Sequence, residues 1–96
     1  MKEYQIFWSP VAEDTYLSTL SQILDRWTIR EAEDFADKVD SLIEKLKHHK
    51  HLCPPYQKFE NLKRCVIAPQ TSLIYQINQD VIELVAFFDN RSEFPY

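Results

Sequence analysis

The sequence predicts an α+β protein in which a helical hairpin packs on an antiparallel sheet, a two-layer sandwich with the order β-α-α-β-β-β. Two observations carry this prediction. Residues 29–46 place apolar side chains at helical spacing, and residues 62–67, 72–78 and 81–88 form three strand-like runs separated by short turns. The 96 residues are 45% hydrophobic, enough for one core, so we expect a single domain spanning 1–96.

The chain opens with a predicted strand over 4–8, which is rich in aromatic and β-branched side chains. Ser9 is then a favourable helix N-cap, and Pro10 suits the first helical position. A helix is therefore predicted over 10–26. Its apolar residues follow at roughly helical spacing: Val11, Leu17, Leu20, Ile23, Leu24 and Trp27.

The second helix has the clearest period in the chain. Thr28 and Glu31 form a capping-box pattern at its start. Its apolar stripe steps by three and four: Ala32, Phe35, Ala36, Val39, Leu42, Ile43 and Leu46. The turn before it is very short, so the two helices should lie antiparallel as a hairpin.

The consecutive prolines Pro54 and Pro55 end any helical tendency, and residues 51–61 are predicted to form a loop. Three strands should follow. Asn78, Gln79 and Asp80 are expected to make a tight hairpin turn between the second and third. The run 81–88 is apolar at all but one position, as expected of a central strand covered on both faces.

Composition excludes several classes of protein. The chain has no glycine, so the glycine-rich phosphate loops of nucleotide-binding proteins are ruled out. No apolar run is long enough to cross a membrane, and the N-terminal apolar stretch stops at Ser9, too soon for a secretory signal. We therefore expect a cytoplasmic protein without a membrane partner, with Cys53 and Cys65 as reduced thiols that serve as small apolar side chains.

Charge is unevenly distributed along the chain. The formal net charge is −4, which argues against a general nucleic-acid binder. Residues 1–44 hold four basic and ten acidic side chains, whereas residues 45–64 hold six basic side chains and only Glu60. Three histidines also lie in this basic stretch: His48, His49 and His51. Such a patch could bind phosphate, or it could complement the dipole at a helix C-terminus.

Several fragments together resemble the RelE/ParE toxin superfamily of bacterial toxin–antitoxin systems. They are SPVAED after the first strand, AEDFADKVDSLIEKLKHHKHLCP in the second helix, and LKRCVI and SLIYQINQDVIELVAFFDNRSEFP in the last strands, with a closing DNR…P signature. The resemblance covers nearly the whole chain. It implies a toxin held inactive by a cognate antitoxin, which in this family lays a helix on the toxin and adds a strand to its sheet.

The resemblance implies two possible activities. RelE-like members are endoribonucleases that cleave messenger RNA on the ribosome, whereas ParE-like members inhibit DNA gyrase without chemistry of their own. The ribosome-dependent nuclease is the first hypothesis here. A gyrase inhibitor is the alternative, and a toxin-fold protein that only binds its antitoxin is the third. No cofactor and no metal ion are expected for any of them.

Cleavage of RNA without a metal needs a base, an acid and cations that stabilise the phosphorane. By resemblance, Arg91 and Lys63 match phosphate-stabilising positions of the nucleases, and Tyr96 lies near their C-terminal tyrosine. Cys65 and Ser72 stand where further cations would be, which favours the gyrase alternative. The remaining candidates come from the residues themselves. Arg64 and His48 are candidate substitutes in catalysis, and the candidate RNA-binding residues are Lys47, Lys50, His51 and Lys58.

Structural roles compete with some of these assignments. Asp89 can cap the turn that DNR forms, and Arg91 can make a surface ion pair. A metal site built from Cys53 and the three histidines lacks the paired-ligand spacing of structural zinc.

Overall fold

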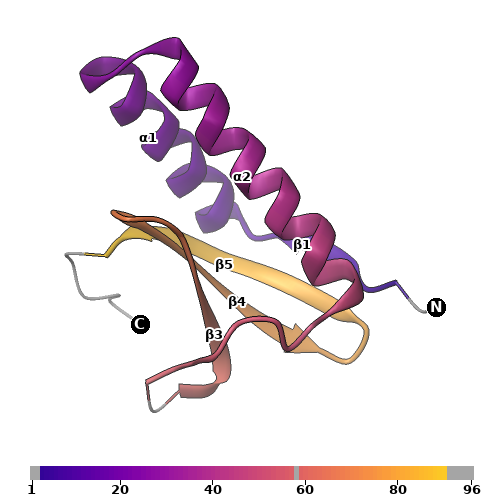
Figure 1. The fold of residues 1–96 in the computed structure, drawn as a ribbon. Coiled ribbons are helices and arrows are strands. Elements are labelled where there is room, and N and C mark those ends of the chain that lie inside the picture. The colour runs from indigo at the N-terminus through magenta and orange to yellow at the C-terminus, as the bar shows by residue number, and fades with distance from the viewer. Residues whose placement is uncertain (1–2, 58, 91–96) are drawn as a thin grey trace.

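The computed structural model describes residues 3–57 and 59–90. Two helices lie together on one face of a five-stranded sheet, as Figure 1 shows. The elements follow the order β1 (Gln5–Trp8), α1 (Pro10–Arg26), α2 (Ile29–His48), β2 (Pro55–Tyr56), β3 (Phe59–Ala68), β4 (Thr71–Asn78) and β5 (Val81–Asp89). The predicted α+β sandwich with a helical hairpin is confirmed. No helix in the described ranges is long and apolar enough to span a membrane.

The sheet is mixed, with the order β1-β5-β4-β3-β2. The three predicted strands β3, β4 and β5 pair antiparallel as expected, and so does β2 with β3, whereas β1 joins the sheet by pairing parallel with β5. The helical hairpin between β1 and the later strands carries the chain back across the sheet, which permits the parallel pairing. The loop predicted over 51–61 is partly wrong, since it contains β2 and the start of β3.

The turn between β4 and β5 confirms its prediction. Gln79 takes a positive φ of 55°, which a turn of two residues requires and which glycine would usually supply. In a chain without glycine, this turn uses Gln79 in its place. β5 lies between β1 and β4, so it is an inner strand as its apolar run predicted, but helices cover only one of its two faces (Figure 1).

Both helix caps form as the sequence predicts. The Ser9 hydroxyl accepts from the amide of Ala12 at 3.0 Å, and the Thr28 hydroxyl accepts from the amide of Glu31 at 3.2 Å. Ser9 also donates to the carbonyl of Val85 at 2.9 Å. The start of α1 is thereby fixed to the sheet.

The two helices bury different shares of their predicted faces. In α2, Phe35, Val39 and Leu46 are buried, which confirms the stripe. In α1, which forms as predicted, four of the apolar residues are at least half exposed: Val11, Leu17, Leu24 and Trp27.

A hydrogen bond to the sheet accounts for the orientation of α1. β1 ends opposite Leu84, so beyond that point β5 has β4 on one side and no strand on the side where β1 lay. Thr15 occupies this edge and accepts from the amide of Phe87 at 2.9 Å. The face of α1 next to Thr15 is therefore the one that packs inward.

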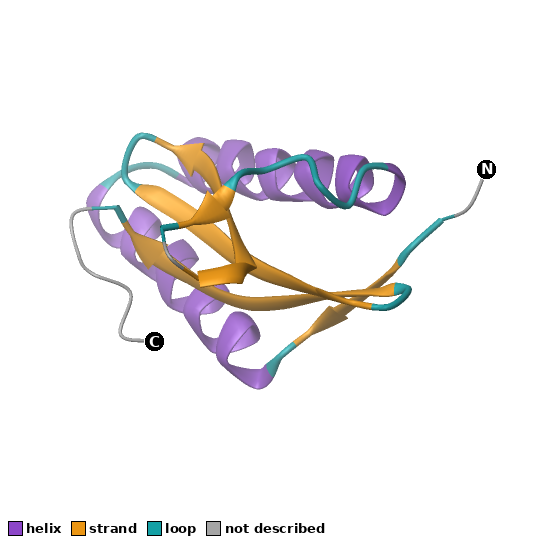
Figure 2. Ribbon diagram, turned by 90° about the horizontal axis from the view of Figure 1, so that it is seen from below, coloured by secondary structure: helices purple, strands orange, loops and turns teal. Residues whose placement is uncertain are grey.

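Aromatic rings fill the space between helices and sheet. Tyr16 of α1 lies 5.3 Å, centroid to centroid, from both Trp8 and Phe87, and Phe35 of α2 packs 6.1 Å from Tyr16. Burial, and then the nearby charge of Asp40, raise the pKa of Tyr16. This packing leaves the other face of the sheet without helices, as Figure 2 shows from below.

Candidate functional site on the open face of the sheet

The face of the sheet that carries no helix, here called the open face, holds a second, smaller apolar cluster. Tyr56, Leu62 and Ile74 are buried there, and Phe59, Val85 and Phe88 pack against them. Alternation along β3 places Arg64 on the same face as Leu62, whereas Lys63 and Cys65 point to the helices. Arg64 and Lys63 are the only basic residues among residues 59–90, so Arg64 alone supplies a cation to this part of the open face.

Arg64 is held from several sides. Its Nε donates to the Ser72 hydroxyl at 3.1 Å, and its Nη2 donates to Asn90 Oδ1 at 3.0 Å. The guanidinium carbon lies 5.5 Å from the ring centre of Phe88 and 6.0 Å from that of Tyr56. These contacts fix the guanidinium in one place, and Arg64 makes no ion pair with a carboxylate in the described part of the chain.

Asn90 organises this cluster from the end of β5. Its amide nitrogen donates to the carbonyls of Pro69 at 3.0 Å and Ala68 at 3.3 Å, and its backbone amide donates to Gln70. Its side-chain oxygen accepts from Arg64 and also from the hydroxyl of Ser72, which is fully buried. Asn90 thus joins the β3–β4 turn to the guanidinium.

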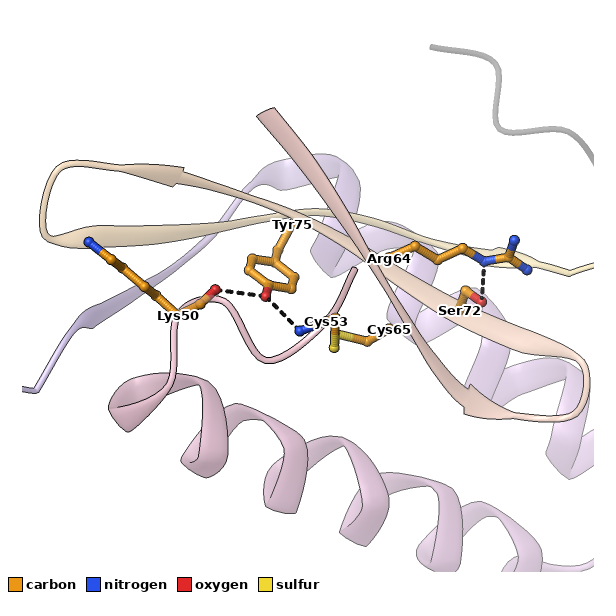
Figure 3. Close-up of a disulfide and its surroundings, with 6 residues drawn as sticks. All are labelled: Lys50, Cys53, Arg64, Cys65, Ser72 and Tyr75. Carbon is orange, nitrogen blue, oxygen red and sulfur yellow. Dashed lines mark hydrogen bonds between the residues drawn. A yellow bond between two sulfur atoms is a disulfide. The ribbon is translucent and has the colours of Figure 1, made fainter. Parts of the chain in front are cut away.

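The two cysteines form a disulfide on the helix-facing side of β3, which corrects the expectation of free thiols. Cys53 lies before β2 and Cys65 lies on β3, and their sequence separation is 12. Figure 3 shows the disulfide and the neighbouring hydrogen bond from Arg64 to Ser72. Cys53 is consequently not available as a thiolate metal ligand. Across residues 3–57 and 59–90, no group of three or more His, Cys, Asp or Glu could hold a metal ion.

The basic residues at the end of α2 lie away from Arg64. Tyr4 donates its amide to the carbonyl of Lys47, and Gln5 donates to Asp80 in the β4–β5 turn. The end of α2 therefore lies near that turn, whereas Ser72 lies at the other end of β4. Asn78 lies six positions along β4 from Ser72, a span of about 20 Å.

The candidate residues of this region contact α2 itself and the residues just before β1. Lys47 pairs with Glu44 at 2.8 Å; their hydrogen bond and mutual charge raise the pKa of Lys47 and lower that of Glu44. His48 lies 4.0 Å from Glu3, and Lys50 lies over the ring of Tyr4 at 5.1 Å. His51 is exposed in the loop that follows.

The structure does not bring all candidate site residues together. Lys63 and Arg64 lie on opposite faces of β3, and His48 lies near the far end of the sheet. Arg91, Tyr96 and Lys58 fall outside the described residues. Sequence reasoning missed the role of Asn90, although its place in the DNR signature marks the position.

No family model matches the sequence, and no curated protein is significantly similar to it. The fold, in contrast, matches solved structures over nearly the whole chain. A chain of the chromosomal ParDE toxin–antitoxin system from P. aeruginosa aligns with a TM-score of 0.76 and 7% identity, covering 91% of this chain and 96% of that chain.

The chain has the RelE/ParE toxin fold. A YoeB/ParE toxin from Agrobacterium tumefaciens aligns with a TM-score of 0.65 and 13% identity over 90% of this chain and 98% of that one. A chain of the E. coli DinJ–YafQ toxin–antitoxin complex gives 0.66 and 15%, over 96% and 98%. The RelE/ParE fold predicted from sequence fragments is thereby confirmed, and identities this low establish the fold alone.

Proposed function

We propose that this chain is the toxin of a type II toxin–antitoxin pair and is neutralised by a cognate antitoxin protein in the bacterial cytoplasm. The observation that carries the proposal is the match of fold over at least nine-tenths of both chains with toxins of such systems. Regulated expression in a bacterial host tests it. Growth should stop on induction and resume when a short neighbouring reading frame is co-expressed. Unimpaired growth at high expression would contradict the proposal.

A cleft between the helices and the β3–β4 turn is a candidate surface for the antitoxin. It encloses about 590 Å³ and is lined on one side by the apolar side chains of Ile23, Trp27 and Phe35. Glu31, Asp34 and Asp37 add three negative charges to its lining, against one positive charge from Lys38. An amphipathic segment with basic side chains would complement both properties. Trp27 is 65% exposed, so a partner would remove much apolar surface from water there.

For the action on its target, we favour binding without chemistry, as in a gyrase inhibitor of the ParE type. RNA cleavage needs several cations with an acid and a base around one phosphate. Among residues 59–90 the open face offers one cation, Arg64, and two of its donors already bind Ser72 and Asn90. The carboxylate of Glu83 accepts a hydrogen bond from Gln76. Gln76 lies four residues along β4 from Ser72, so this candidate acid or base is about 13 Å from the Arg64 cluster.

The messenger RNA endonuclease is the second candidate. Arg64 is immobilised with part of its donor set still available to a phosphate, and Arg91 follows directly on Asn90 in the sequence. In this case the ribosome and its messenger RNA are the partners. Arg91 and Tyr96 are then the further catalytic candidates, and Lys47, Lys50, His51 and Lys58 are the candidates for contact with RNA backbone.

One experiment separates the two candidates. After induction, 5′ ends of transcripts are mapped and the DNA damage response is measured in the same culture. Gyrase inhibition predicts a damage response with intact transcripts, whereas the nuclease predicts cuts at codon positions. Arg64→Leu should reduce toxicity under both. The matched control is Lys63→Leu, an equal loss of charge on the opposite face, which should keep the toxicity.

A further inference from the structure

The segment from the end of α2 to β2 is covalently bound to the sheet by the disulfide. Residues Cys53 and Cys65 have their Cα atoms 5.4 Å apart. β2 itself has only two residues, and its pairing with β3 contains an irregularity between Pro55 and Tyr56. Two residues give a strand little independent stability. The covalent link is therefore the strongest attachment of this segment.

Three hydrogen bonds accompany the disulfide. The Tyr75 hydroxyl donates to the carbonyl of Lys50 at 2.8 Å and accepts from the amide of Cys53 at 3.4 Å, as Figure 3 shows. The amide of Arg64 donates to the carbonyl of Pro54 at 3.0 Å. On the side of the segment, each bond involves a residue within three positions of Cys53. On the side of the sheet, the partners are Tyr75 of β4 and Arg64 of β3.

The same segment forms one side of the Arg64 site. Pro54 follows Cys53 and binds the Arg64 backbone, and Arg64 precedes Cys65 on β3. Tyr56, 5% exposed, lies against the guanidinium and the open-face cluster. Release of the Cys53 end would therefore loosen both a backbone bond and an aromatic contact of Arg64.

We propose that the Cys53–Cys65 disulfide is a redox switch for the Arg64 site, an inference that rests on the function proposed for that site. The oxidised chain holds Tyr56 against Arg64 and binds its target. Reduction frees residues 50–56 and weakens binding. The bacterial cytosol keeps most thiols reduced, so the protein would gain its full affinity for the target only under oxidising conditions.

The chemistry requires a cellular dithiol as reductant. Cys53 is partly exposed and Cys65 is 3% exposed, so a thiolate of the dithiol attacks the Cys53 sulfur. The S–S bond breaks, and Cys65 leaves as a thiolate that takes up a proton. The second thiol of the reductant then displaces Cys53 from the mixed disulfide. Two electrons and two protons pass to the protein, and the reductant becomes a disulfide.

The first test follows the switch itself in the full chain. Protein equilibrated with glutathione disulfide and kept without reductant should resist alkylation by a maleimide, and dithiothreitol should expose two thiols. On reduction, hydrogen exchange at the amides of Cys53 and Arg64 should accelerate at least tenfold. Exchange in the β4–β5 ladder should change less than twofold. Labelling without reductant, or unchanged exchange at Arg64, would overturn the proposal.

Variants extend the test. Cys53→Ser should exchange like the reduced chain, whereas His51→Ala, in the same loop with the disulfide intact, should exchange like the oxidised one. If the serine variant does not fold, the reduced natural sequence supplies the comparison. An exchange pattern in Cys53→Ser that equals the oxidised chain would refute the coupling.

Toxicity separates this inference from the proposed function. In a host strain with an oxidising cytosol, Cys53→Ser should require at least tenfold more inducer than the natural sequence to arrest growth. If Arg64→Leu reduces toxicity and Cys53→Ser does not, the switch is wrong while the proposed site stands. If growth is never arrested, both the proposed function and the control of toxicity by the disulfide are wrong. Alkylation and exchange would then still report whether the disulfide controls Arg64.

Discussion

Replacing Arg64 by leucine and Ser72 by alanine, singly and together, measures how strongly the open-face cluster is coupled. The Arg64 Nε lies 3.1 Å from the Ser72 hydroxyl, and Ser72 is fully buried. Removing a hydrogen bond to a charged donor costs about 1.5–3 kcal/mol, and a buried group left unpaired adds to this. Arg64 is only half-buried, so water compensates part of the loss.

From these contacts we expect each single substitution to lower the free energy of unfolding by about 2 kcal/mol. Arg64→Leu removes two hydrogen bonds but leaves an apolar side chain against Phe88. Ser72→Ala removes one hydrogen bond of Arg64 and one hydrogen bond of Asn90. Because the two changes break one shared bond, the double variant should lose about 3 kcal/mol, a coupling of about 1 kcal/mol.

Urea unfolding of the four proteins is the assay, with constant m-values as the requirement for comparing them. The matched control pairs Lys63→Leu with Ser72→Ala, since Lys63 points to the opposite face. That pair should be additive within about 0.5 kcal/mol. A coupling between Arg64 and Ser72 as small as that of the control pair would refute the cluster as described.

Three further predictions concern the disulfide, the helix faces and alkaline pH. Breaking the disulfide by Cys65→Ala should lower the free energy of unfolding by about 3 kcal/mol, as expected for a loop of 12 residues, and dithiothreitol should destabilise the natural sequence but not the variant. Leu46→Ala should cost about 3 kcal/mol because Leu46 is fully buried, whereas Leu24→Ala, at a site 50% exposed, should cost less than about 0.5 kcal/mol in the same urea titration. Burial raises the pKa of Tyr75 above its usual 10.0. The free energy of unfolding should therefore hold below pH 10 and fall as the pH rises through the higher pKa of the folded state. Tyr75→Phe should show a smaller fall between about pH 9 and pH 11, and an equal dependence on pH in both proteins would contradict this.

The elements and caps of this protein follow from local sequence. Ser9 and Thr28 place a side-chain oxygen where free amides need one, and the stripe of α2 has a period that only a helix can bury on one side. The run of β5 is apolar on both sides and therefore predicts a central strand. These features depend on neighbours within a few residues, so the sequence alone was sufficient to predict the fold class.

The rotation of α1 and the position of β1 depended on contacts between distant segments. Thr15 meets the amide of Phe87, 72 residues away, and this bond turns Leu17 and Leu24 outward. The apolar pattern of α1 fits more than one inward face, and only the uncovered edge of β5 selects among them. Likewise, nothing local to residues 4–8 specifies parallel pairing with β5.

The candidate site shows the same division. The sequence identifies Arg64 as a basic residue on a strand whose side chain should oppose that of Lys63, and this alternation holds. Its partners Ser72 and Asn90 lie 8 and 26 residues away, and the disulfide joins a loop to a strand across 12. Only strand register and the path of the chain across the sheet bring such groups within hydrogen-bond or covalent reach, because a side chain spans a few ångströms and its partner must be carried there by the fold.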